Sequence, residues 1–136
     1  MSLVKDAMVS DPHALAVGAT AQEAGEALTR PEVRAVLVVE DDGALAGVVT
    51  RKTLVRRVVA TGLDPVRTRL GDVMEAPNHR IESSMELDVA FAFLEEHDLE
   101  RVPVVDDGKL VGVLSRAVIQ RRLAEDEPPQ DPEEVF

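Results

Sequence analysis

The sequence predicts a mixed α/β fold of the α+β type, made of two β-α-β-β-α repeats packed sheet to sheet with pseudo-twofold symmetry. Three observations support this. Most of the 136-residue chain repeats itself at a spacing of 65 or 66 residues. Each copy combines short aliphatic runs, typical of buried strands, with amphipathic segments that have the period of a helix. Aromatic residues are scarce, with three Phe, no Trp and no Tyr, so the core must be aliphatic.

The repeat is clearest in two segments of each copy. Residues 4–8 recur as residues 70–74, and residues 45–51 recur as residues 110–116. The spacing falls from 66 to 65 because one residue is lost in the acidic turn before the second of these segments. Turns tolerate changes of length, so a slip at this place is typical of a true duplication.

Each copy begins with a short strand, residues 14–17 and then 80–83, followed by a helix. Thr20 and Glu23 form a capping box at the start of the first helix, and we expect Ser83 with Glu86 to do the same in the second copy. Apolar residues recur at helical spacing on both helices. They are Ala21, Ala24, Gly25 and Leu28 in one copy and Leu87, Ala90, Phe91 and Leu94 in the other.

Two further strands follow in each copy, joined by an Asp-Gly turn that is typical of an antiparallel hairpin. The strands are residues 35–39 and 45–49, then 102–105 and 110–114. A second helix starts after Thr50 or Ser115, both good N-caps. Its apolar positions are Leu54, Val55, Val58 and Val59 in the first copy, and Val118, Ile119 and Leu123 in the second.

These elements divide the chain into a first repeat at residues 1–62, a linker at 63–69 and a second repeat at 70–123. Residues 124–136 have six acidic residues, no basic one and three prolines, so we expect a disordered acidic tail. The tail holds six of the eleven net negative charges. A unit of about 60 residues buries little apolar surface alone, so the copies should pack on each other and leave clefts between them.

Composition excludes several classes of function. The chain has no Cys, which excludes disulfides, thiolate metal sites and cysteine nucleophiles. Its longest aliphatic run is far shorter than the ~20 residues of a membrane span, and its first residues do not resemble a signal peptide, so we expect a soluble cytoplasmic protein. With a net charge of −11, nucleic acid is not an expected partner. The paired carboxylates lie in turns and no catalytic motif is present, so we do not expect an enzyme.

Taken in order, several elements resemble a family. They are an Asp-x-Met segment at the start of each copy, the residues 101–106, and the Gly-h-x-Thr/Ser-Arg elements, in which h is apolar. Together they resemble a free-standing tandem pair of CBS (cystathionine-β-synthase) domains over residues 3–123. The resemblance implies a regulatory module without a required cofactor. It would bind AMP, ADP, ATP or S-adenosylmethionine between the repeats and modulate an unidentified protein partner. It also implies a homodimer through the repeat helices, a disc of four repeats.

The same resemblance points to ligand-binding residues. In the family, Gly-h-x-Thr/Ser-x-x-Asp supplies a hydroxyl to the ligand and a carboxylate to its ribose, at a helix N-terminus that favours phosphate. Here Thr50 and Ser115 keep the hydroxyl, but Thr53 and Val118 stand where the carboxylate belongs. This departure keeps an alternative open, a ligand-free dimerisation or protein-interaction module that has lost nucleotide binding.

Other candidate ligand contacts are basic or imidazole side chains. Arg101, with Arg34 near the equivalent place in the first copy, could meet a phosphate, although each could instead be a surface residue whose stem covers apolar area. The remaining candidates are Arg51, Arg116, His13 and His79. Arg51 and Arg116 belong to basic clusters that could bind phosphate, although such clusters are more often solvated helix faces or pair with acids such as Glu95 and Glu96 across a dimer. The two His lie at equivalent positions and could bracket a cleft or be structural. We expect no metal site, because neither His has a second ligand nearby.

Overall fold

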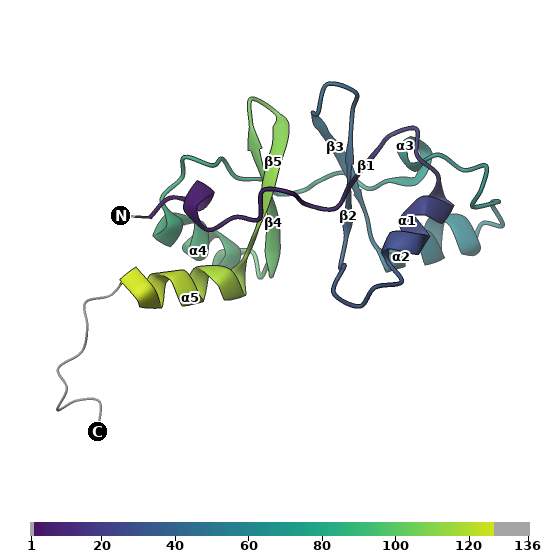
Figure 1. The fold of residues 1–136 in the computed structure, drawn as a ribbon. Helices are drawn as coiled ribbons and strands as arrows, with labels where there is room; N and C mark the ends of the chain where they lie inside the picture. The colour runs from purple at the N-terminus through teal and green to yellow at the C-terminus, as the bar shows by residue number, and fades with distance from the viewer. Residues whose placement is uncertain (1, 127–136) are drawn as a thin grey trace.

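The computed structural model describes residues 2–126 and consists of two similar halves (Figure 1). A 3-10 helix, η1 (Val4–Asp6), precedes the first half. The first half holds β1 (Ala14–Ala16), α1 (Ala21–Ala27), β2 (Val36–Val39), β3 (Leu45–Val49), α2 (Arg51–Leu54) and the π-helix η2 (Val55–Val59). The second repeat begins with α3 (Leu70–Val73), which lies beside α1 in the first half (Figure 1). The second half holds α4 (Leu87–Glu96), β4 (Arg101–Asp106), β5 (Lys109–Ser115) and α5 (Arg116–Asp126).

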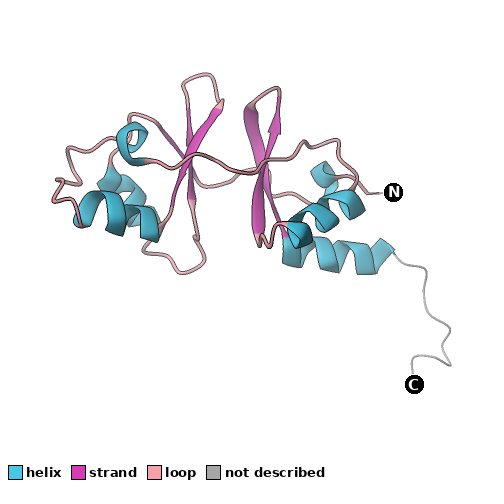
Figure 2. Ribbon diagram, turned by 180° about the vertical axis from the view of Figure 1, so that it is seen from behind, coloured by secondary structure: helices cyan, strands magenta, loops and turns pink. Residues whose placement is uncertain are grey.

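The sheets occupy the centre of the molecule and the helices lie on the two outer flanks (Figures 1 and 2). In the first half β2 pairs with β1 in parallel and with β3 antiparallel, and in the second half β4 and β5 form an antiparallel pair. Leu37, Leu45 and Val105 form a buried cluster that joins the two sheets. The expected α+β architecture of two repeats packed sheet to sheet is confirmed.

The two repeats exchange their first turns. Val4, at the start of the chain, is fully buried in the core of the second half, and its N–H donates to the carbonyl of Met85 over 2.9 Å. Leu70, at the start of the second repeat, is fully buried in the core of the first half, and its N–H donates to the carbonyl of Ala19 over 2.8 Å. Each core therefore needs a segment from the other repeat, and the repeats fold as one interlocked domain.

This exchange explains why two strand positions are occupied by glycine. Gly47 and Gly112 occupy the same place in β3 and β5, where the crossing segments pass over the sheets. A methyl group on Gly47 would lie 2.5 Å from the sulfur of Met74, and one on Gly112 would lie 2.7 Å from both the sulfur of Met8 and the carbonyl oxygen of Val9. The Met of each Asp-x-Met segment thus packs directly on a sheet glycine of the opposite repeat.

The first strand of the second repeat differs from the prediction. Residues 80–83 form a single parallel bridge, between Ile81 and Val104, instead of a strand. Ser83 bonds to the end of β4: its hydroxyl donates to a carboxylate oxygen of Asp106 over 2.6 Å, and its N–H donates to the other oxygen over 3.1 Å. Consequently Ser83 does not cap α4, whose N-cap is Glu86 without a side-chain bond, and the expected capping box there is wrong. The box of Thr20 and Glu23 is confirmed.

The second helices also differ from the prediction. After one α-helical turn the first repeat continues as the π-helix η2, which has more residues per turn. Within η2, Val58 is buried, whereas Val55 and Val59 are 57% and 70% exposed. Helix α5 runs on to Asp126, so residues 124–126, expected in the tail, are helical; the first proline of that segment, Pro128, lies beyond them. The rest of the expected tail, residues 127–136, lies outside the described residues.

Within residues 2–126 no helix combines the length and the apolar character that crossing a bilayer requires.

Candidate functional site

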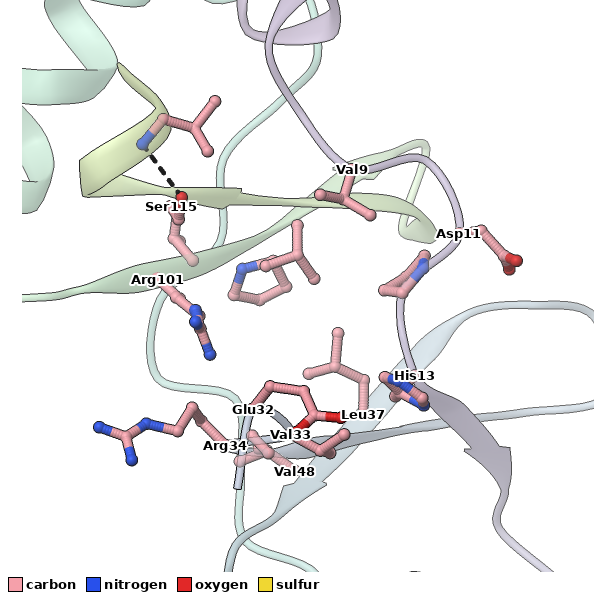
Figure 3. Close-up of a pocket in the computed structure, with 16 residues that line it drawn as sticks. Val9, Asp11, His13, Glu32, Val33, Arg34, Leu37, Val48, Arg101 and Ser115 are labelled. Carbon is pink, nitrogen blue, oxygen red and sulfur yellow. Dashed lines mark hydrogen bonds between the residues drawn. The ribbon is translucent and has the colours of Figure 1, made fainter. Parts of the chain in front are cut away.

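A cleft of about 530 Å3 opens between the two repeats (Figure 3). It is built from the crossing segment before β1, the loop that leads into β2, and the second-repeat elements β4, β5 and α5. Its lining residues are Val9, Asp11, Pro12, His13, Glu32, Val33, Arg34, Ala35, Leu37, Val48, Arg101, Val102, Pro103, Val113, Ser115 and Val118. Both repeats are therefore needed to form it.

The interior of the cleft is mostly apolar. Val33 and Val48 come from the first repeat, and Pro103 and Val113 come from the second. Volumes of about 300–1,000 Å3 with apolar walls and a few polar groups are typical of small-molecule sites. The walls therefore suit a flat apolar group such as a purine, held by contact and desolvation more than by hydrogen bonds.

Two arginines give the cleft an anion-binding edge. In Figure 3 Arg34 and Arg101 lie on one side of the opening, and Asp11 and His13 lie on the other. Arg101 is the first residue of β4, and its Cα pairs with that of Ser115 at the end of β5, immediately before α5. Guanidinium groups hold phosphate through charge-assisted hydrogen bonds, often two at once.

The N-terminus of α5 also favours an anion at this edge of the cleft. Ser115 lines the cleft, and its hydroxyl oxygen accepts the N–H of Val118 over 3.2 Å, so the expected N-cap is confirmed. The hydroxyl hydrogen stays free to donate to a ligand. The first N–H groups of a helix carry a partial positive charge that favours anions. A phosphate at this edge would meet both arginines' charge and the helix N-terminus.

Two acidic residues of the cleft, Asp11 and Glu32, were not among the sequence candidates. Asp11 lies in the segment that crosses to the other repeat, and Glu32 lies in the loop before β2. In the sequence, only the position of Asp11 two residues before His13 could have suggested Asp11 as a candidate. Nothing in the sequence indicates that this segment crosses to the other repeat. In Figure 3 the carboxylate of Glu32 lies at the cleft, where it could accept hydrogen bonds from a ligand's hydroxyl or amino groups, whereas that of Asp11 points outward.

Four of the nine sequence candidates line this cleft: His13, Arg34, Arg101 and Ser115. Val118, which stands where the family has its ribose-binding carboxylate, also lines it and presents an apolar side chain. The other five candidates lie elsewhere. They are Thr50, Arg51, Thr53, Arg116 and His79.

Thr50 and Thr53 form a closed polar network with Glu75. The hydroxyl of Thr53 donates to a carboxylate oxygen of Glu75 over 2.8 Å, and its oxygen accepts the N–H of Thr50 over 3.0 Å. Thr53 is 1% exposed. Glu75 also faces Arg57 at 3.9 Å. The N-terminal turn of α2 is thus satisfied within the protein, whereas the equivalent turn of α5 faces the cleft.

Arg51 and Arg116 have matching structural contacts. The guanidinium of Arg51 donates to the carbonyls of Leu28 and Arg30 over 2.7 and 2.9 Å, which anchors α2 to the end of α1. Arg116 donates to the carbonyl of Leu94 over 3.4 Å and pairs with Glu100 at 3.3 Å. Both arginines therefore join the two helices of their own repeat.

His79 contacts other rings. Its imidazole lies 4.6 Å from that of His97 and 5.8 Å from the ring of Phe93, centroid to centroid. His97 is the C-cap of α4. Across residues 2–126 no group of three or more acidic or imidazole side chains is arranged to hold a metal ion.

Comparison with known proteins gives consistent matches. The family model of the CBS domain matches residues 4–60 and 70–125. The CBS domain-containing protein YhcV of Bacillus subtilis is 32% identical, over 85% of this chain and 81% of YhcV. The meiotically up-regulated gene 70 protein of Schizosaccharomyces pombe is 34% identical over 100% of this chain, which spans 18% of that longer protein. A crystal structure of CBSX2 in complex with AMP superposes with a TM-score of 0.74 at 27% identity, covering 93% of this chain and 98% of CBSX2.

Proposed function

The chain belongs to the CBS-domain family as a tandem pair, and from that premise we propose that it binds an adenosine-type ligand between its repeats and modulates a partner protein. AMP is the first candidate, and ADP, ATP and S-adenosylmethionine share its adenosine. The observation that carries the proposal is the apolar cleft edged by Arg34, Arg101 and the N-terminus of α5. The module itself is proposed to be regulatory and not catalytic.

The chemistry of AMP suits this cleft. Its purine fits the apolar walls, and its phosphate fits the edge formed by Arg101, Arg34 and Ser115. That CBSX2, a structural relative at 27% identity, was crystallised with AMP supports the choice. His13 lies on the opposite side of the opening, near the exposed end of such a ligand.

We propose one ligand per chain. The position equivalent to Val118 in the first repeat is Thr53, which is buried and bonded to Glu75. A ligand at that turn would have to break this network and would meet a carboxylate near its phosphate, which is repulsive.

A second function deserves a test because of Val118. With a valine in place of the ribose-binding carboxylate, the alternative is a module that binds no nucleotide and acts only through protein contacts. Thermal unfolding with millimolar AMP, ADP, ATP or S-adenosylmethionine separates the two. Binding raises the unfolding midpoint through the term RT ln(1 + [L]/Kd). No shift with any of the four would favour the ligand-free module.

Calorimetric titration with AMP then tests the site. Arg101→Ala removes a charge-assisted contact to phosphate, so we expect AMP binding about tenfold weaker or more. Arg67→Ala is the matched control, because Arg67 is exposed, does not line the cleft, and pairs with Asp64 three residues earlier at 3.8 Å. Equal affinity in the Arg101→Ala and Arg67→Ala variants would place the ligand elsewhere.

We also propose a homodimer formed through the repeat helices, as a disc of four repeats. Its support is a set of large apolar side chains exposed on those helices: Val55 is 57% exposed, Val59 is 70% exposed and Val89 is 50% exposed. Exposed apolar side chains gathered on a face are typical of an interaction surface.

A further inference from the structure

We infer that Glu32 holds the ribose of the ligand from the first repeat and so selects for nucleotides that keep their ribose hydroxyls. The inference rests on the proposed function and adds a residue that determines its specificity. In the second repeat Val118 stands where a ribose-binding carboxylate would be, and it lines the cleft with an apolar side chain. Each ribose hydroxyl has a hydrogen to donate, so a bound ribose needs an acceptor from another element.

The carboxylate of Glu32 is the acceptor that the cleft offers. Two acidic residues, Asp11 and Glu32, are found among the described residues that line it. In Figure 3 the carboxylate of Asp11 points outward, whereas that of Glu32 turns toward Leu37 at the cleft. Glu32 is exposed, and within residues 2–126 its side chain forms no hydrogen bond or ion pair. Both of its carboxylate oxygens are therefore available to a ligand.

The positive charges near Glu32 are placed for the phosphate of the same ligand. Arg34 lies two residues further along the same loop, and Arg101 is the first residue of β4. In Figure 3 the guanidinium of Arg34 points away from the carboxylate of Glu32. Neither arginine has a side-chain partner within residues 2–126. A phosphate held by the two arginines brings the ribose, which is esterified to it, to the edge of the cleft beside Glu32.

The charge of Glu32 acts on the two parts of a nucleotide in opposite ways. The carboxylate repels a nearby phosphate, whereas it accepts charge-assisted hydrogen bonds from the ribose hydroxyls. The affinity for AMP therefore contains both effects. The ratio of the dissociation constants of dideoxy-AMP, which lacks both ribose hydroxyls, and AMP isolates the hydrogen bonds, because both ligands carry the same phosphate.

Calorimetric titration of the full chain with AMP and with dideoxy-AMP tests the role of Glu32. We expect the wild-type chain to bind dideoxy-AMP about tenfold more weakly than AMP or worse, because the analogue leaves the carboxylate without its hydrogen bonds. In Glu32→Gln the ratio should fall to about threefold, and in Glu32→Ala to about one. Both variants should fold as the wild type does, since the side chain of Glu32 has no partner to lose within residues 2–126.

Asp11→Asn is the matched control, because it removes the carboxylate that lines the cleft but points outward. We expect its ratio to equal that of the wild type. A wild-type ratio near one, an unchanged ratio in Glu32→Ala, or an equal fall in Asp11→Asn would each overturn the role of Glu32 while AMP binding itself persists. A wild-type chain that binds neither AMP nor dideoxy-AMP would instead refute the proposed function.

Discussion

The N-terminal turns of α2 and α5 occupy equivalent places in the two repeats, yet they do different things. Both begin with a capping hydroxyl, Thr50 or Ser115. Three residues later, Thr53 is buried and bonded to Glu75, whereas Val118 lines the cleft. The comparison teaches that a duplicated motif does not imply duplicated surroundings, because the residue three positions after the cap is bonded within the protein in one repeat and lines the cleft in the other.

The largest expected effect concerns the sheet glycines. Gly112→Ala would place a methyl group 2.7 Å from a backbone carbonyl oxygen, that of Val9, which cannot move without shifting the crossing segment. We expect a loss of about 2–3 kcal/mol in the free energy of unfolding, as for overpacked cores. Gly47→Ala should cost a similar amount, because its methyl group would lie 2.9 Å from the Cβ of Met74, which moves only with the backbone of its crossing segment. Urea denaturation of both variants measures the two losses, and a loss below about 0.5 kcal/mol for either would contradict the tight packing of the crossing segments.

The next effect concerns the N-terminal turn of α2, where Thr50, Thr53 and Glu75 form a polar network. Thr53→Val removes the hydroxyl that Thr50 and Glu75 use, and leaves a part-buried N–H and carboxylate without this partner. We expect a loss of about 1–2 kcal/mol. Val118→Thr is the reciprocal change at a position that faces the cleft, so its effect should stay within about 0.5 kcal/mol. Thermal and urea unfolding would show the asymmetry; a larger loss for Val118→Thr would reverse our assignment of the two turns.

A smaller difference is expected between Arg51 and Arg116. Arg51→Ala removes two short bonds to carbonyls at the end of α1, so we expect a loss of about 1 kcal/mol. Arg116→Ala removes longer contacts, and the Nε of Arg116 is buried without a partner among the described residues, so its loss should cost less. If unfolding by urea ranked the two variants the other way, these contacts would not account for their roles.

The smallest effect is a change of pKa in the second repeat. The hydroxyl of Ser83, and then its N–H, lower the pKa of Asp106. Because the folded value lies below the unfolded one, the carboxylate contributes stability above the ordinary pKa of about 3.9, and this is lost as the pH falls through the folded value. Ser83→Ala should raise the pKa of Asp106 toward its ordinary value, which an NMR pH titration of the carboxyl carbon would detect. An unchanged titration would show that the bond does not persist in solution.

Most of the fold could be predicted from the sequence because its signals are local. The hairpins follow from an Asp-Gly turn between aliphatic runs, and the caps Thr20, Thr50 and Ser115 follow from their position before an amphipathic segment. The strand predicted at residues 80–83 is a single bridge to β4, and neither this shortening nor the bond between Ser83 and Asp106, 23 residues apart, has a local sequence signal.

The candidate site could be predicted only in part. Arg101 and Ser115 came from the motif, and they do line the cleft. The closure of Thr53 on Glu75 could not be foreseen, because Glu75 reaches α2 only through the exchange of first turns between the repeats. Asp11 and Glu32 enter the cleft for a similar reason, since tertiary packing and not local pattern decides which loop residues line it.

The most direct test of the central claim is an NMR titration of the protein with AMP, followed at the backbone amides of the two helix N-termini. We predict that the amide signals of residues 115–118 shift and saturate at one AMP per chain, while those of residues 50–53 stay in place. Shifts at residues 50–53, or no shift at residues 115–118 while AMP binds, would contradict the account.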